Sequence, residues 1–400
     1  VLGGGISSDA HHITAPRDDS EGQMNAMKWA LAKSKMDPKE IAYINGHATG
    51  TVKNDTTEIQ AMQNIFGDND NTAVDSTKSM VGHCLGAAEA IYTVKALTTN
   101  TVPPTIGYSE EDLERLKEKA GKLDFMPNVK KEKDIEYAMT NNFAFGGNNA
   151  SVIFAKHEKD IKEPENNKVY VTGIGLVSPL GNSVESYIEG SKAGVTKAEN
   201  GNIHAGVSSE DYAKYGIKLA FYRKLDKLSQ MQVVSGRACL DNAGVTVTDD
   251  NATDIGMIVG TSDGPATDII NFHEGLIKNG LHQGSAFVFP NTVYNAAGGY
   301  FSINSGVKGV NVTLTNGPQA YNVVKTGDEK MMIATGLDEN TDTMELLYDK
   351  LGLLSDKDEA TPYAMDGRSF VLGEGATSIM LESEASANER GAKKLAEVAG

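Results

Sequence analysis

Two histidines lie in stretches whose neighbours suit proton chemistry. His47 lies within Ile44–Thr51 (Ile-Asn-Gly-His-Ala-Thr-Gly-Thr), and His83 closes Lys78–His83 (Lys-Ser-Met-Val-Gly-His), so each has small residues and hydroxyls around it. Histidine is the side chain best suited to exchange a proton near neutral pH. A single histidine in an apolar setting is more often a core residue than a catalyst. Two of them in a chain with only eight, with Lys78 five residues before His83, predict a catalytic pair.

Short apolar runs precede both stretches and predict buried strands. The first run ends at Asn45, and the second is Ala73–Thr77. The sequence also predicts a helix over 55–66 and another over 82–98. Strands and helices alternate in the same way along the rest of the chain, which indicates the α/β class with a mostly parallel, buried sheet.

Composition excludes several classes of protein. The net charge of −17 argues against nonspecific binding of nucleic acid and against binding to an anionic membrane surface. The two cysteines, Cys84 and Cys239, are too few for a disulfide framework or a zinc site, and we expect no metal. The sequence has no apolar run of membrane-spanning length and no signal pattern at its start, so we expect a soluble, cytoplasmic protein.

The chain divides at a charged, proline-containing segment without apolar periodicity. This segment covers 157–167 and predicts a linker between a first part, 1–156, and a second part, 168–400. Near the end of the first part, Phe143–Asn149 (Phe-Ala-Phe-Gly-Gly-Asn-Asn) separates two predicted strands. Gly146 and Gly147 permit a positive φ, so this stretch is either a tight turn or a loop that gates a substrate.

Seven separated segments of the chain share one further feature. They are Asn45–Thr51, Ser76–His83, Val102–Thr105, Asn142–Asn149, Val171–Gly175, Ser178–Gly181 and Phe370–Ala376. Together they resemble the β-ketoacyl-acyl-carrier-protein synthases of the thiolase-like superfamily. The resemblance covers nearly the whole chain. It implies the thiolase-like five-layered α-β-α-β-α fold built from two similar halves.

The order of the halves is reversed relative to that family. Residues 1–156 resemble its C-terminal half, and residues 168–400 resemble its N-terminal half. A circular permutant joined by the 157–167 linker is the simplest explanation. The alternative is a segment of a longer protein that spans parts of two tandem synthase modules.

The resemblance also assigns roles to individual residues. His47 and His83 match the histidines that assist malonyl decarboxylation and stabilise the enolate, and Lys78 matches the lysine that organises the second histidine. The family's nucleophilic cysteine has no equivalent here, because the matching stretch Thr315–Asn322 contains no cysteine. Gln319 falls closest to the position of that cysteine.

Further residues match the family's substrate contacts. Thr49 and Thr51 match hydroxyls near the pantetheine arm of the carrier protein. Phe145 matches the gating phenylalanine, Phe143 matches its neighbour, and Gly146 belongs to the same turn. The resemblance implies no cofactor, since the substrate is carried on the phosphopantetheine of the carrier.

Four functions stay open from the sequence. The first is a chain-length-factor-like subunit that lacks the nucleophilic cysteine and pairs with an active ketosynthase. The second is a malonyl-carrier decarboxylase, the third an active 3-oxoacyl-acyl-carrier-protein synthase, and the fourth a non-catalytic scaffold. The expected partners are an acyl carrier protein and either an active synthase subunit in a heterodimer or a second copy in a homodimer.

Overall fold

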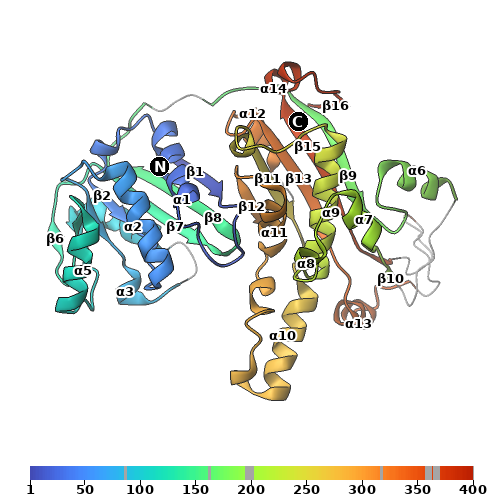
Figure 1. Ribbon diagram of the computed structural model, residues 1–400, viewed down its shortest axis with the longest axis horizontal. Helices are drawn as coiled ribbons and strands as arrows, with labels where there is room; N and C mark the ends of the chain where they lie inside the picture. The colour runs from blue at the N-terminus through green and yellow to red at the C-terminus, as the bar shows by residue number, and fades with distance from the viewer. Residues whose placement is uncertain are drawn as a thin grey trace. The chain divides into compact units, whose positions relative to one another are not determined.

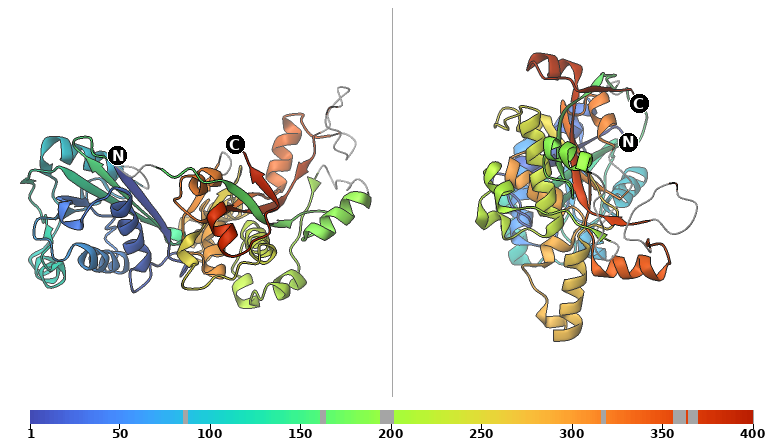
Figure 2. Two further views of the ribbon diagram at one scale, coloured as in Figure 1. Left: turned by 90° about the horizontal axis from the view of Figure 1, so that it is seen from above. Right: turned by 90° about the vertical axis from the view of Figure 1, so that its right-hand side faces the viewer.

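Apolar runs of the sequence form the central strands of two sheets, one in each of the units Val1–Pro164 and Glu165–Gly400 (Figure 1). The structure is a computed structural model that describes residues 1–84, 88–160, 164–193, 202–315, 319–355, 363 and 370–399. In both units helices pack on the sheet, as the further views in Figure 2 also show. The α/β class predicted from the sequence is therefore confirmed.

The sheet of the first unit has the strand order β1-β8-β7-β2-β3-β5. Strand β2 is parallel to β3 and β7, whereas β8 is antiparallel to β1 and β7. The strands of this unit are β1 (Gly3–Ser8), β2 (Tyr43–Asn45), β3 (Ala73–Asp75), β4 (Thr101–Val102), β5 (Asp124–Phe125), β6 (Lys131–Glu132), β7 (Tyr137–Ala144) and β8 (Asn148–Ala155). Strands β4 and β6 pair separately from the main sheet.

The second unit repeats this topology. Its sheet has the order β12-β11-β13-β15-β9-β16, in which β11 is parallel to β12 and β13, and β15 is antiparallel to β9 and β13. Strands β9, β11, β12, β13 and β15 thus correspond to β1, β2, β3, β7 and β8. The strands are β9 (Val169–Val177), β10 (Asn202–Ile203), β11 (Ile255–Gly260), β12 (Asn311–Leu314), β13 (Met331–Asp338), β14 (Leu372–Gly373), β15 (Gly375–Ser383) and β16 (Ala396–Val398).

The expectation of a mostly parallel sheet is wrong in detail, since both sheets are mixed. In the first unit β7 and β8 are joined by the short 3-10 turn η2 (Phe145–Gly147), and so short a connection can only join antiparallel neighbours. Of the two interpretations of Phe143–Asn149, the tight turn is thus what the backbone forms. Gly146 and Gly147 have φ of 83° and 74°, a conformation that glycine adopts without strain.

The helices keep the predicted order but not every predicted boundary. The helix expected over 82–98 begins later, because the chain first forms the short α3 and then α4, with residues 85–87 outside the described part. The helices of the first unit are α1 (Glu21–Lys33), η1 (Pro38–Glu40), α2 (Val52–Phe66), α3 (Lys78–Val81), α4 (Ala88–Thr99) and α5 (Glu110–Ala120).

The second unit carries its helices in the same alternation with the strands. They are α6 (Val184–Ala193), α7 (Ser209–Lys214), α8 (Leu219–Tyr222), α9 (Lys227–Asn242), η3 (Ala252–Asp254), α10 (Ala266–Asn279), η4 (Leu281–Gln283), η5 (Phe289–Thr292), α11 (Ala296–Ser305), α12 (Ala320–Lys325), α13 (Asp342–Lys350) and α14 (Glu384–Glu389). Across the described parts of both units, a helix with the length and apolarity needed to cross a bilayer is absent.

The first long helix of each unit approaches its first strand at a glycine. A Cβ on Gly5 of β1 would lie 2.1 Å from the Ala26 carbonyl oxygen of α1. A Cβ on Gly175 of β9 would lie 2.0 Å from the Ser235 carbonyl oxygen of α9. Because the obstacle is backbone in both cases, the helix can pack this closely only where the strand has no side chain.

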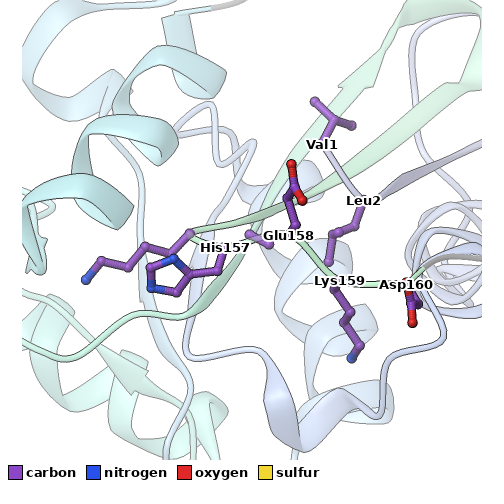
Figure 3. A pocket seen from close by; sticks show the side chains of 8 residues that line it. Val1, Leu2, His157, Glu158, Lys159 and Asp160 are labelled. Carbon is purple, nitrogen blue, oxygen red and sulfur yellow. The ribbon is translucent and has the colours of Figure 1, made fainter.

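The predicted linker is packed against a unit at each of its ends. Lys159 forms an ion pair with Glu40 at 3.1 Å, and Figure 3 shows Lys159 and its neighbours lining a pocket with Val1. Farther along, the backbone N–H of Glu165 donates to the Thr326 carbonyl at 3.1 Å. The division between the units falls after Pro164, within the predicted 157–167 segment.

Substitution of Gly175 by alanine should destabilise the second unit by about 3 kcal/mol, because the added Cβ forces α9 off the sheet. Urea unfolding followed by circular dichroism measures this. Gly336→Ala is the matched control: Gly336 also lies in a strand of that sheet, and a Cβ there has no heavy atom within 4 Å. Equal effects of the two substitutions would contradict the close-approach explanation.

Candidate active site

The predicted catalytic residues of the first unit follow two adjacent parallel strands. Strands β2 and β3 are in register, with Asn45 opposite Asp75, so both end at the same level. His47 comes two residues after β2, and Lys78 comes three residues after β3 at the start of α3. The carboxyl edge of the sheet therefore brings together two loops that are distant in sequence.

The two histidines lie side by side. The ring centroids of His47 and His83 are 5.4 Å apart with an interplanar angle of 81°. The Phe143 ring lies 5.9 Å from the His47 ring. His47 is 6% exposed, whereas His83 is exposed. The pair predicted from sequence is thus brought together, with one buried member and one member open to solvent.

His47 is held in its neutral form. Burial lowers its pKa to about 3, with further lowering by the positive charges of Lys78 and His83. Its Nδ1 is buried and has no hydrogen-bond partner among the residues that the structure describes. A neutral imidazole of this kind can donate a hydrogen bond to an oxyanion through its N–H, or accept a proton at its other ring nitrogen.

A buried glutamate fixes the backbone that carries His47. The two carboxylate oxygens of Glu58, on α2, accept hydrogen bonds from the backbone N–H groups of His47 and Ala48, each at 2.7 Å. Burial raises the pKa of Glu58 to about 7, partly offset by those two hydrogen bonds. Sequence reasoning missed Glu58. Its one signal is that it precedes Ala61 and Met62 by three and four residues, on the buried face of α2.

Lys78 is equally buried and is paired with a second missed residue. Its Nζ lies 2.5 Å from Oε1 of Glu89 on α4, and both side chains are almost fully buried. An isolated buried ammonium is costly, so the carboxylate stabilises the charged lysine next to His47. Lys78 thus acts on His47 through its charge, as the family resemblance suggested for the neighbouring histidine.

A third buried carboxyl lies under the two loops. Oδ1 of Asp75 accepts hydrogen bonds from the Tyr43 hydroxyl at 2.6 Å and from Nδ2 of Asn45 at 3.1 Å. Asn45 also reaches the Thr77 hydroxyl at 3.4 Å, so the group connects the ends of β2 and β3. Burial raises the pKa of Asp75 to about 7, and the hydrogen bonds from Tyr43 and Asn45 offset this rise only in part.

The remaining predicted contacts of the first unit are distributed around this edge. The hydroxyls of Thr49 and Thr51 are 3.0 Å apart at the start of α2. Phe143 is buried beside His47, whereas Phe145 is 43% exposed at the turn that Gly146 completes. Among the described residues, no cluster of three or more His, Cys, Asp or Glu side chains could hold a metal ion.

Gln319 lies in the second unit, at the place that corresponds to the Lys78 turn of the first. It precedes α12 and follows β12, the strand that corresponds to β3. Residues 316–318, which include part of the predicted nucleophile turn, lie outside the described residues. Cys239 is buried within α9, where burial raises the pKa of its thiol, and Cys84 is exposed immediately after His83.

Two family models match the chain. The model of the β-ketoacyl synthase C-terminal domain matches residues 1–109, and the model of the β-ketoacyl synthase N-terminal domain matches residues 188–387. The chain belongs to the β-ketoacyl synthase family. This confirms the family resemblance inferred from the sequence motifs.

Curated relatives match over part of their length. The chloroplastic 3-oxoacyl-[acyl-carrier-protein] synthase I of Arabidopsis thaliana is 41% identical over 157 residues, which are 38% of this chain and 32% of that protein. The 3-oxoacyl-[acyl-carrier-protein] synthase 2 of Rhizobium meliloti is 40% identical over 161 residues, which are 39% of this chain and 37% of that protein. The chain thus spans about a third of the length of these relatives.

Solved structures share the fold at low identity. A protein described as "PfaC Keto synthase-Chain length factor" superposes with a TM-score of 0.69 at 16% identity, over 96% of this chain and 48% of that chain. "The ishigamide ketosynthase/chain length factor" superposes with a TM-score of 0.50 at 22% identity, over 59% of this chain and 63% of that chain. The thiolase-like fold of two similar halves is confirmed.

Replacement of Asp75 by asparagine should stabilise the protein progressively from about pH 4 to pH 7. The pKa of Asp75 in the folded chain is about 7, above its usual 3.8. The carboxyl therefore contributes fully to the free energy of unfolding at low pH, where it is protonated in both states. This contribution is lost as the pH rises from about 4 to 7, because the unfolded chain ionises first. Asparagine cannot ionise and keeps the neutral partners. We expect the free energy of unfolding of Asp75→Asn, relative to the unchanged protein, to rise by up to about 4 kcal/mol over this range in urea titrations.

Asp112→Asn provides the control for this titration. Hydrogen bonds from Ser109 lower the pKa of the exposed Asp112, so this carboxyl is ionised above pH 4 whether folded or unfolded. Its difference from the unchanged protein should stay constant over the same range. If Asp75→Asn behaves like Asp112→Asn, the raised pKa of Asp75 is wrong.

Proposed function

We propose that the chain is a ketosynthase-family subunit of fatty acid or polyketide biosynthesis that acts on acyl-carrier-protein substrates and is of the chain-length-factor type. The observation that carries this proposal is Gln319, which precedes α12 at the strand-to-helix turn where the family places its cysteine. The sequence between Thr315 and Asn322 contains no cysteine. A glutamine amide is not a nucleophile, so acyl transfer to this turn has no acceptor.

The partner in this proposal is an active ketosynthase subunit, which supplies the missing thiol. Two of the similar structures are described as ketosynthases with a chain length factor, which supports such a pairing. The substrate arrives on the phosphopantetheine of an acyl carrier protein, so the chain needs no cofactor of its own.

A malonyl-carrier decarboxylase is the second candidate, and the neighbouring His47 and His83 favour it. Loss of CO₂ breaks a carbon–carbon bond and leaves its electron pair in an enolate. Hydrogen bonds from the two imidazoles to the enolate oxygen would stabilise that charge. This step requires no thiol, and a subunit with a purely architectural role has no need of the buried Lys78 charge next to His47.

The order of the two halves fits either a circular permutant or, as the alternative, a tandem arrangement in which the units belong to successive family modules. The C-terminal domain model matches before the N-terminal one, and a chain that joins a keto synthase and a chain length factor superposes on 96% of this chain with 48% of its own. In the tandem arrangement, the histidines and Gln319 would belong to different modules.

Intact mass of the protein from its natural source separates the permutant from the tandem arrangement, since a permutant can have a mass near 42.6 kDa, whereas a tandem protein is much larger.

Incubation of the chain alone with acyl-loaded and malonyl-loaded carrier protein should give no 3-oxoacyl product and no covalent acyl adduct, because the turn has no thiol. Mass spectrometry of the carrier and of the chain measures both. If the same mixture gives acetyl carrier, His47→Ala should reduce its rate at least about 100-fold. His157→Ala, a histidine in the linker segment, should leave the rate unchanged. A 3-oxoacyl product from the chain alone would contradict the proposal.

Chromatography tests the partner role. The chain mixed with an active ketosynthase should elute as a stable complex of the two, and the complex should condense acyl and malonyl groups. A chain that forms only a homodimer and leaves the synthase unbound would argue against the chain-length-factor type.

A further inference from the structure

The loop that carries His47 and the turn that carries Lys78 are joined through a single serine. The hydroxyl of Ser76 donates to the carbonyl of Ala48, the residue after His47, at 3.0 Å. The backbone N–H of the same Ser76 donates to the hydroxyl of Thr105 at 2.8 Å. Ser76 therefore connects three segments at the carboxyl edge of the first sheet.

A second hydroxyl doubles this connection. Ser79 donates to the carbonyl of Ser76 at 2.9 Å, and its oxygen accepts the backbone N–H of Ile106 at 3.0 Å. Thr105 and Ile106 thus bind both ends of the Ser76–Ser79 turn. We call Ser76, Ser79, Thr105 and Ile106 the clasp of the Lys78 turn.

The clasp is anchored in the sheet and not only in loops. The Thr105 N–H donates to the Met126 carbonyl, and the Thr105 carbonyl accepts from the Asn128 N–H, both at 2.8 Å. Met126 in turn donates to Val74 in β3 at 2.9 Å. Pro103 and Pro104 precede this anchor and restrict its backbone to the extended conformation.

We propose that Ser76 and Thr105 are positioning residues, which hold the Lys78 ammonium and the His47 imidazole at a fixed separation. Neither side chain would touch a substrate. They act by preventing the Lys78 turn from moving away from the His47 loop. Glu58 fixes the backbone of His47, and Glu89 forms an ion pair with Lys78. All of these contacts lie within the first unit. The catalytic role of the two residues rests on the proposed decarboxylation.

Thr105→Val tests the clasp, because valine keeps the shape of threonine and removes the acceptor of the buried Ser76 N–H. With the clasp open, Lys78 moves away and water enters, so the pKa of His47 should rise by at least about one unit from its value of about 3. Nuclear magnetic resonance of the His47 ring, in the full chain, measures this directly. Lys78 and His83 act on the pKa of His47, and Glu58 accepts a hydrogen bond from its backbone; all three are retained in the variant.

Matched variants separate positioning from stability. Thr105→Ser retains the hydroxyl and should restore the His47 pKa, whereas Ser76→Ala removes the link to Ala48 and should raise it as Thr105→Val does. In strand β4, Thr101→Val removes a hydroxyl that donates to the Thr99 carbonyl at the end of α4, and this variant should leave the His47 pKa unchanged. If Thr105→Val and Ser76→Ala lower the melting temperature but leave the His47 pKa unchanged, both residues are merely structural and the proposal is overturned.

Kinetics supply an independent measurement. Where the unchanged chain forms acetyl carrier, Thr105→Val should lower kcat about tenfold with little change in KM, because substrate contacts remain while the charge next to the imidazole moves. A raised KM with unchanged kcat would overturn the positioning role. If the unchanged chain forms no acetyl carrier, the decarboxylase candidate fails, and the His47 titration still decides for or against the clasp.

Discussion

The buried ion pair between Lys78 and Glu89 is the interaction on which the candidate site depends. An ammonium without its carboxylate would be strongly disfavoured at this depth, and the turn after β3 would have to open toward water. The pair keeps a positive charge next to His47 and contributes to its low pKa. Glu58 and Asp75 add two further buried carboxyls, so ionisable groups concentrate at one edge of a largely apolar sheet.

The two units use one topology to carry different side chains at equivalent turns. Both place a long helix against the first strand at a glycine, and both direct the loops after the second and third strands to one edge. In the first unit those loops carry His47 and Lys78, whereas in the second the corresponding turn after β12 leads to Gln319. Membership of the family is therefore enough to predict the fold. The function depends on which side chains occupy the equivalent turns of the two units.

The sequence predicted the α/β class, because the alternation of strands and helices is a local pattern. It also predicted His47, His83 and Lys78 as candidate site residues, because small residues near histidines at strand ends form a local pattern too. It did not reveal Glu58, Glu89 or Asp75, since a charged residue is ordinarily placed at the surface and only tertiary packing shows that these three are buried. The helix expected over 82–98 failed at its start for a related reason. The sequence predicted one helix over 82–98, whereas the chain forms the short α3, which carries Lys78, and then α4, whose second residue is Glu89.

The low pKa of His47 affects how strongly its side chain would bind a malonyl substrate compared with the transition state for loss of CO₂. A cationic imidazole would attract the carboxylate of a malonyl group, and that attraction would be lost as CO₂ departs. An interaction stronger in the ground state slows the reaction. A neutral imidazole gains strength as negative charge moves to the enolate oxygen. In the proposed decarboxylation, a His47 that stays neutral well below neutral pH would bind the enolate more tightly than the malonyl carboxylate.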